Sequence, residues 1–177
     1  MYRLSQQPIP VTLSDDEVQQ TLDFIEELRK DKEKHGVTDR MFDRNNTSEG
    51  INIIGHLGEQ AVGKVLGLPV DTTVLTGGDA GHDMYIGDTT IQVKTSELTK
   101  LIFNAKHLFK SDVAVLAQFV GKDKRKAHED PRFLIWGWIE RQKFLKDHYT
   151  HDFGYGLRLI LDAEYLHTLD SLVEEAQ

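Results

Sequence analysis

The sequence contains no cysteine among its 177 residues. Disulfides, iron–sulfur clusters, thiolate zinc sites and a cysteine nucleophile are therefore excluded. No apolar run approaches the roughly 18 to 20 residues that a membrane-spanning helix needs, so we expect no membrane association. The N-terminal residues lead into a polar stretch with two prolines, which is unlike a signal peptide. We expect a cytoplasmic protein.

The excess of acidic residues lies at the two ends of the chain. The formal net charge is −8. Residues 1–50 hold 11 acids and 7 bases, and residues 162–177 hold 5 acids and no Lys or Arg. Residues 51–161 hold 13 acids and 14 bases, which leaves them close to neutral. The acidic total therefore does not argue against a nucleic-acid partner for the middle of the chain.

The order of predicted elements is typical of an α/β protein. A capping box of Ser14 and Glu17 opens the first helix. Helical spacing of apolar residues predicts helices over 14–34, 52–67, 98–110, 140–148 and 163–175. Apolar and alternating runs predict strands over 71–76, 82–87, 89–95, 113–120, 132–139 and 156–161.

We expect one structural domain with three parts. Residues 1–50 form an N-terminal helix and a polar linker, and residues 51–161 form the core. Residues 162–177 form an acidic C-terminal helix. The nearly continuous apolar run at 113–120 is typical of a strand buried on both faces, which places it inside the sheet.

The chain from 81 to 95 predicts a β-hairpin. Gly87-Asp88 is typical of a two-residue turn, and such a turn pairs Asp83 with Gln92 across the hairpin. Sliding the strands by one residue would mix apolar and polar side chains on each face, so the pattern itself favours this register. One face is then apolar and belongs on a core; it carries Met84, Ile86, Ile91 and Val93.

The other face of the hairpin brings an acid, an amide oxygen and an ammonium group together. It carries Asp83, Tyr85, Thr90, Gln92 and Lys94. Such a face is often only solvated, but the helix at 52–67 adds a carboxylate, Glu59. Glycines weaken a helix yet allow its backbone to approach a neighbour closely. With Gly55 and Gly63 one turn away on either side, we expect Glu59 to be brought over the edge of the sheet.

Three short segments together resemble the PD-(D/E)XK nuclease superfamily, which includes restriction endonucleases and Holliday-junction resolvases. The segments are Gly58-Glu59, Gly81-His82-Asp83 and Gln92-Val93-Lys94-Thr95. The resemblance covers residues 52–120, where the predicted order of elements also fits. It implies a restriction-endonuclease-like core, a mixed β-sheet flanked by helices (αβββαβ), with added N- and C-terminal helices. It also implies a metal-dependent endonuclease that hydrolyses DNA phosphodiester bonds.

The resemblance gives the motif residues their roles. Asp83 matches the metal-binding aspartate, and Gln92 stands where most members have an acid. Glu59 matches a helical glutamate that many members use as a further ligand, and the main-chain carbonyl of Val93 completes the set. Such oxygen ligands suit Mg²⁺ or Mn²⁺. An amide oxygen contributes no charge, and Glu59 would restore the charge that Gln92 lacks.

The chemistry implied is metal-assisted hydrolysis. A bound metal lowers the pKa of a coordinated water and neutralises charge at phosphorus. Lys94 would orient the attacking water and stabilise the negative charge that develops. A second departure from the family pattern, His82 in place of proline before Asp83, is shared by many members.

Basic residues outside the hairpin are candidates for contacting DNA phosphates. Contacts of this kind give affinity without sequence information. A solvated hairpin tip explains the basic loop at 121–126 equally well. The candidates are the helical residues Lys100, Asn104 and Lys106 and the loop residues Lys122, Lys124, Arg125 and Lys126.

Two other functions stay open. The same fold could bind nucleic acid without cutting it, with Gln92 weakening the site, or the acidic ends could bind a basic protein. Because two cuts need two sites, a nuclease of this kind would often be a homodimer.

The segment 58–64 reads GxxxxGK, but Val65 replaces the Ser or Thr of a phosphate-binding loop. Its glycines also fall inside a predicted helix, so we expect no nucleotide cofactor.

Overall fold

The computed structural model describes residues 7–36, 48–70, 82–105 and 109–175, with the side chains of 48–52 left aside. The helices are α1 (Asp15–Lys34), α2 (Ser48–Leu66), α3 (Arg141–Asp147) and α4 (Leu169–Glu175). The strands are β1 (Ile9–Thr12), β2 (Met84–Ile86), β3 (Thr89–Ser96), β4 (Lys100–Asn104), β5 (Val113–Phe119), β6 (Arg132–Glu140), β7 (Tyr149–Asp152) and β8 (Leu157–Asp162). Short 3₁₀ turns cover Lys124–Lys126 and Ala163–Tyr165.

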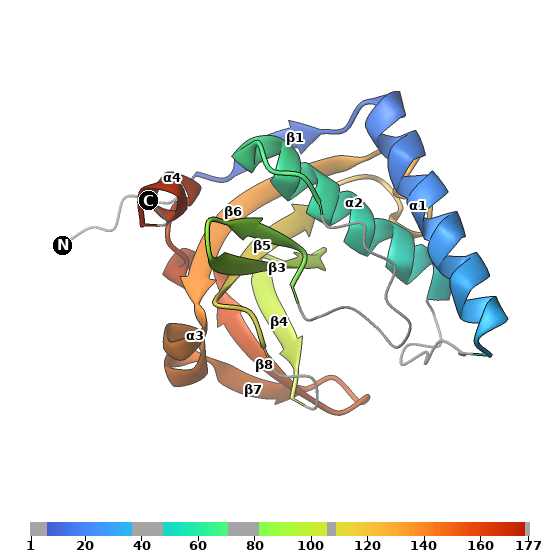
Figure 1. Ribbon diagram of the computed structural model, residues 1–177. Coiled ribbons are helices and arrows are strands. Elements are labelled where there is room, and N and C mark those ends of the chain that lie inside the picture. The colour runs from blue at the N-terminus through green and yellow to red at the C-terminus, as the bar shows by residue number, and fades with distance from the viewer. Residues whose placement is uncertain (1–6, 37–47, 71–81, 106–108, 176–177) are drawn as a thin grey trace.

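The chain is a mixed α/β protein with two sheets (Figure 1). The larger sheet has the strand order β1-β6-β5-β3-β2, and the smaller has the order β4-β8-β7. β3 and β5 run parallel, whereas the other neighbours in both sheets are antiparallel. The large sheet is therefore mixed, as the resemblance implies, and the small sheet is antiparallel.

Each face of the large sheet covers a separate apolar core. On one face, α2 packs against β3 and β5, and α1 lies beside α2 (Figure 1). On the other face, the second core joins β5 to the small sheet and α3. Three rings meet there: Phe103 stacks on Phe109 with ring centroids 4.8 Å apart, and it meets Phe144 edge to face with centroids 5.0 Å apart. β5 is buried on both sides, which explains its continuous apolar run.

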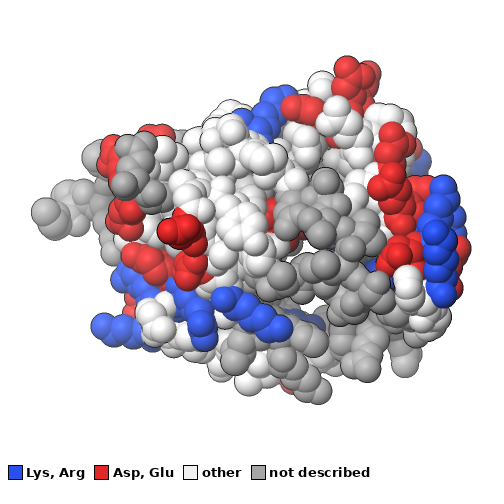
Figure 2. All heavy atoms as spheres, in the orientation of Figure 1, with Lys and Arg blue, Asp and Glu red and all other residues white. Residues whose placement is uncertain are grey.

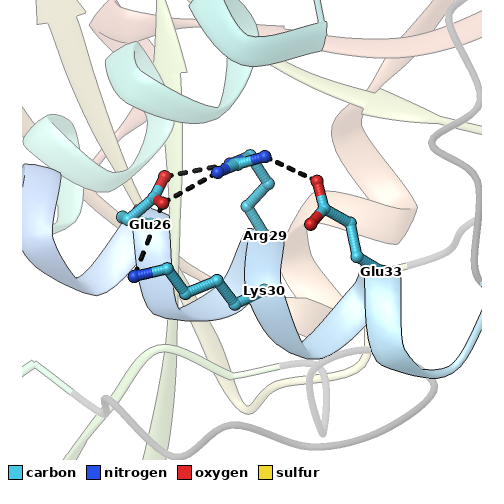
Figure 3. A network of polar contacts seen from close by, with 4 residues as sticks. All are labelled: Glu26, Arg29, Lys30 and Glu33. Carbon is cyan, nitrogen blue, oxygen red and sulfur yellow. Dashed lines mark hydrogen bonds and ion pairs between the residues drawn. The ribbon is translucent and has the colours of Figure 1, made fainter.

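The first helix begins where its capping box predicts. Ser14 Oγ accepts from the Glu17 amide at 3.3 Å, and Glu17 Oε2 accepts from the Ser14 amide at 2.7 Å. Along its exposed side, Arg29 bridges Glu26 and Glu33, and Lys30 also reaches Glu26 (Figure 3). The hydrogen bond from Arg29 outweighs desolvation and lowers the pKa of Glu26 to about 2. The helix is thus held by local contacts that the sequence already shows.

The helix expected over 98–110 is wrong where the structure describes it. Residues 100–104 form the strand β4, paired with β8, and residues 106–108 lie outside the described part. Leu101 and Phe103 are buried while their neighbours are half-exposed, which is a period of two. Strand pairing with β8 and packing of Phe103 outweigh the helical spacing of the apolar residues, because β structure depends on such tertiary partners.

The remaining differences concern the ends of helices, short strands and segments outside the described residues. α2 begins at Ser48, inside the polar segment 36–50, and most of that segment lies outside the described residues. The expected strand at 71–76 also lies outside them. The C-terminal helix is shorter than expected, because 163–165 is a 3₁₀ turn and α4 starts at Leu169. β1 and β7 were not foreseen, since each has only four residues.

Candidate active site

The predicted hairpin is confirmed from Met84 to Ile91, whereas the expected pairing of Asp83 with Gln92 is not part of the observed register. Met84 pairs with Ile91 and Tyr85 with Thr90, in antiparallel register. Gly87 adopts a φ of 57°, the left-handed conformation that such a tight turn requires. The apolar face is buried at Met84, Ile91 and Val93. The polar face therefore lies where the sequence pattern predicts.

Asp83 is fixed by the backbone of the partner strand. Its main-chain amide donates to the Ile91 carbonyl at 2.7 Å. Its carboxylate Oδ2 accepts from the Val93 amide at 2.6 Å. These two bonds aim the carboxylate across the hairpin towards β3, so the acid is held in place by the fold and not by a flexible loop.

The Val93 carbonyl points to the same side of β3 as Asp83. In a strand, the N–H and C=O of one residue are directed at the same neighbouring strand. Because the Val93 amide is directed at Asp83, the Val93 carbonyl is directed to that side of β3 as well. β2 pairs with β3 only as far as Ile91, so the strand edge beyond that residue is not covered by β2. The carbonyl oxygen lies on that edge.

Gln92 carries a buried oxygen without a partner. Within the described part of the chain, its side-chain Oε1 is buried and accepts no hydrogen bond. A buried polar atom left unpaired costs about 1–3 kcal/mol, and such atoms usually contact water, an ion or a ligand. The amide oxygen expected to bind a metal is thus directed into the protein with no other described role.

Lys94 lies two residues further along β3, on the same face as Gln92. Their cross-strand neighbours in β5 are Leu116 and Ala114, which belong to the second core. The Lys94 ammonium lies 5.0 Å from the centroid of the Phe103 ring on β4. A cation over an aromatic face is attracted by about 0.5–2 kcal/mol. This contact orients the long side chain within the site.

Glu59 reaches the site from the opposite face of the sheet. α2, which carries it, packs on the face that holds Val93. Its carboxylate is 15% exposed, and Oε2 lies 2.9 Å from Nδ1 of His56. The charges of Glu59 and Asp83 both act on His56, which places the two carboxylates within electrostatic range of one imidazole. The two carboxylates therefore lie in the same region of the molecule.

The glycine that lets α2 approach β3 is Gly58, and the expectation for Gly55 and Gly63 is wrong. A Cβ on Gly58 would meet Thr95 Oγ1 at 2.0 Å, whereas a Cβ on Gly55 meets nothing within 4 Å. Gly63 is crowded by the Leu68 carbonyl just after the helix, not by the sheet. Close packing thus occurs at the residue next to Glu59, which sets how near that carboxylate comes to β3.

Sequence reasoning missed His56. Burial tends to lower its pKa, but the hydrogen bond to Glu59 and the charges of Glu59 and Asp83 outweigh burial and raise the pKa overall. An available signal was the spacing His56-x-x-Glu59, which puts both side chains on one face of a helix.

The predicted DNA contacts on 98–110 do not form a helical face. Lys100 is on β4, where its ammonium hydrogen-bonds Asp162 and, at 2.8 Å, the Tyr149 hydroxyl. The bond to Asp162 is the main cause of a raised pKa for Lys100. Asn104, at the other end of β4, pairs with Arg158, and Lys106 lies outside the described residues. Lys100 and Asn104 are thus part of the small sheet.

The basic loop has acidic neighbours. Lys124 pairs with Glu97 at 2.9 Å, next to the end of β3. The other side-chain pairs are Arg125 with Asp123 at 3.2 Å and Lys126 with Glu129 at 3.5 Å, and the Lys122 amide donates to Asp130 at 2.9 Å. The loop is therefore close to the site but partly neutralised, which reduces its attraction for phosphates. On the face shown in Figure 2, red and blue side chains lie next to one another towards the left and right edges, and uncharged side chains lie between them.

By their chemistry, the predicted ligands suit a divalent cation that prefers oxygen donors. Among the described residues, no three His, Cys, Asp or Glu side chains come together as a metal site. The predicted ligands are instead two carboxylates, the Gln92 amide oxygen and the Val93 carbonyl. Mg²⁺ is held in this way by few protein ligands and several waters. The unpartnered Gln92 oxygen is the observation that supports this fit.

Comparison with known proteins gives no relative. The chain matches no family model, no curated protein and no solved structure. In the part of the chain that the structure describes, none of the helices combines the length and apolar character needed to cross a membrane.

Proposed function

We propose that the protein is a metal-dependent endonuclease that hydrolyses DNA phosphodiester bonds. The observation that carries the proposal is the buried, unpartnered Oε1 of Gln92, one residue from the amide that holds Asp83. A purely structural hairpin face gains no stability from a buried amide oxygen that accepts no hydrogen bond.

The fold offers a second line of support. In the nuclease superfamily that the motifs resemble, two strands of a mixed sheet carry the acid and the lysine. Here the β2–β3 hairpin carries Asp83 and Lys94, and β5 runs parallel to β3. We therefore propose a restriction-endonuclease-like core in which strand β4 replaces part of the expected crossover helix.

The chain's own residues would act as follows. Asp83, Glu59, Gln92 and the Val93 carbonyl would hold Mg²⁺ or Mn²⁺. When bound, the metal supplies charge neutralisation at phosphorus and a water of lowered pKa. Lys94 donates hydrogen bonds to the attacking water and to the charge that builds up on the phosphate oxygens. Packing on Phe103 keeps its ammonium within the site.

A nuclease fold that binds DNA without cutting it is the second candidate. The neutral Gln92 favours it, because an amide contributes no charge to a metal site. The ion pairs of the basic loop count against strong binding by that loop alone. DNA is the proposed partner in both cases, and a homodimer is proposed only for the cutting enzyme.

The test is a cleavage panel of supercoiled plasmid, linear duplex, single strand, four-way junction and RNA, each with Mg²⁺ or Mn²⁺. Wild type is compared with Asp83→Ala and Lys94→Ala. Two matched controls, Asp88→Asn in the hairpin turn and Lys143→Met on α3, change the same charges away from the site. Size-exclusion chromatography with light scattering gives the oligomeric state of each preparation.

The nuclease proposal predicts that wild type and both controls cut at least one substrate, whereas Asp83→Ala and Lys94→Ala do not. Binding without cutting by the wild type supports the second candidate. Cleavage that persists in both site variants would overturn the assignment of the hairpin as the active site.

A further inference from the structure

A small pocket lies between α1 and α2, beside the proposed active site. Its volume is about 250 Å³, which is below the roughly 300–1,000 Å³ of pockets for drug-sized ligands. Its size therefore favours a small planar group over a whole cofactor. Residues on its walls include Gln20, Phe24, His56, Glu59, Gln60 and Val70.

The walls combine aromatic rings with side-chain amides. The rings of Phe24 and His56 meet at 82°, with centroids 5.4 Å apart. The side-chain amides of Gln20 and Gln60 can each donate and accept hydrogen bonds. Amides of this kind recognise the edges of nucleobases. Aromatic rings are the surfaces on which unstacked bases pack. Together these walls provide both contacts that a base requires.

The charge of the pocket suits a neutral group. The carboxylate among its described wall residues, Glu59, is already bonded to His56 at 2.9 Å. None of the described residues on its walls is a Lys or Arg that could hold a phosphate. An anion would be repelled by Glu59, whereas the π-face and edges of an uncharged base are compatible with these walls.

We propose that this pocket receives one unstacked base of the DNA substrate, next to the phosphate held at the active site. The inference rests on the proposed function, because Glu59 belongs both to the pocket and to the proposed metal ligands. A base can enter only if it leaves the stack, which is easiest in single strands, branch points or distorted duplexes. Those structures are accordingly the preferred substrate class.

The experiment measures binding of fluorescein-labelled single-stranded oligonucleotides by anisotropy, using Asp83→Asn protein so that no strand is cut. One strand is complete, and each of the others lacks a single base. The variants are Phe24→Ala, Phe24→Tyr, which keeps the ring, and Phe153→Ala, which removes an exposed ring elsewhere. Circular dichroism melting of each variant reports whether it is folded.

The proposal predicts one position whose missing base weakens binding about five- to 150-fold, the range that base–aromatic stacking contributes. Phe24→Ala weakens binding of the complete strand by a similar factor but adds nothing for the strand that lacks that base. Phe24→Tyr restores most of the affinity, and Phe153→Ala changes none of these values.

Three results would overturn the proposal. The first is no binding of any strand, and the second is equal binding of all strands. The third is a Phe24→Ala effect of the same size on the complete strand and on every strand that lacks a base. Cleavage by the wild type with no position dependence would reject the pocket and leave the nuclease function. Position-dependent binding without cleavage by the wild type would keep the pocket and reject the nuclease function.

Discussion

At the scale of single residues, His56 links the two carboxylates of the proposed site. Its Nδ1 lies 2.9 Å from Glu59 Oε2, and its raised pKa reflects the charges of Glu59 and Asp83 acting against burial. Groups that hydrogen-bond a metal ligand fix its orientation, and losing one typically costs 10- to 100-fold in metal affinity or activity. His56 is therefore a positioning residue for Glu59.

Replacing His56 tests that role. We expect His56→Ala to raise the Mg²⁺ concentration for half-maximal cleavage by about 10- to 100-fold. His56→Asn should restore most of the loss, because its amide nitrogen can donate to Glu59 from nearly the position of Nδ1. Thermal unfolding of both variants separates positioning from general destabilisation. Equal metal dependence in all three proteins would rule the role out.

Gln92 gives a test in which stability and activity change in opposite directions. Gln92→Leu removes an unpartnered buried oxygen, and we expect the free energy of unfolding to rise by about 1 kcal/mol. The same change removes a proposed metal ligand, so cleavage should fall by at least about 100-fold, as for other groups that stabilise transition-state charge. Urea unfolding and a cleavage assay measure the two effects. Wild-type cleavage by the more stable variant would contradict the ligand role.

At the scale of elements, the position of α2 depends on one close contact. Gly58→Ala would place a Cβ 2.0 Å from Thr95 Oγ1, and such overpacking costs about 1–3 kcal/mol. Gly55→Ala is the matched control, because a Cβ there meets nothing within 4 Å. The control should gain about 0.5–1 kcal/mol by replacing a helical glycine.

Chemical denaturation of these variants and of Gly58→Ala/Thr95→Ala distinguishes the causes. The double variant should recover part of the loss, because it removes Oγ1 but keeps the Thr95 Cβ position 3.1 Å away. Equal stabilisation by both single alanine substitutions would show that α2 does not depend on this contact.

The elements that local sequence determines were predictable, and those that depend on distant partners were not. The capping box of α1 and the turn at Gly87 involve residues within four positions of one another, so their pattern is readable directly. β4 depends on pairing with β8, some 60 residues away, and its apolar spacing also fits a helix. The polar face of the β2–β3 hairpin was therefore predictable from the sequence. The contacts of Lys100 with Asp162 and Tyr149 were not.

At the scale of the whole molecule, many surface carboxylates stabilise the fold in their charged form. Glu17 and Asp112 have lowered pKa values; burial opposes the shift at Glu17, and hydrogen bonds outweigh it. At Asp130, the hydrogen bond from Arg132 to the carboxylate lowers the pKa from 3.8 to about 2. Its oxygens also accept from the Lys122 amide at 2.9 Å, which closes the loop before β6.

A lowered pKa gives stability that is present above the unfolded value and lost as pH falls through the folded one. For Asp130 this loss falls between pH 3.8 and about 2. We expect the unfolding temperature to drop through that range, and Asp130→Asn to reduce the drop while lowering stability slightly near pH 7. Thermal melts recorded across the range test this. An identical acid profile for the two proteins would contradict the assigned ion pair.

The proposed function requires Asp83, Gln92 and Glu59 to bind one divalent cation together. Calorimetric titration of the metal-free protein with Mn²⁺ tests it most directly, with Asp83→Asn as the site variant and Asp88→Asn as the control. We expect one site per chain in the wild type and the control, and no measurable site in Asp83→Asn. Binding that is unchanged in Asp83→Asn, or absent from the wild type, would contradict it.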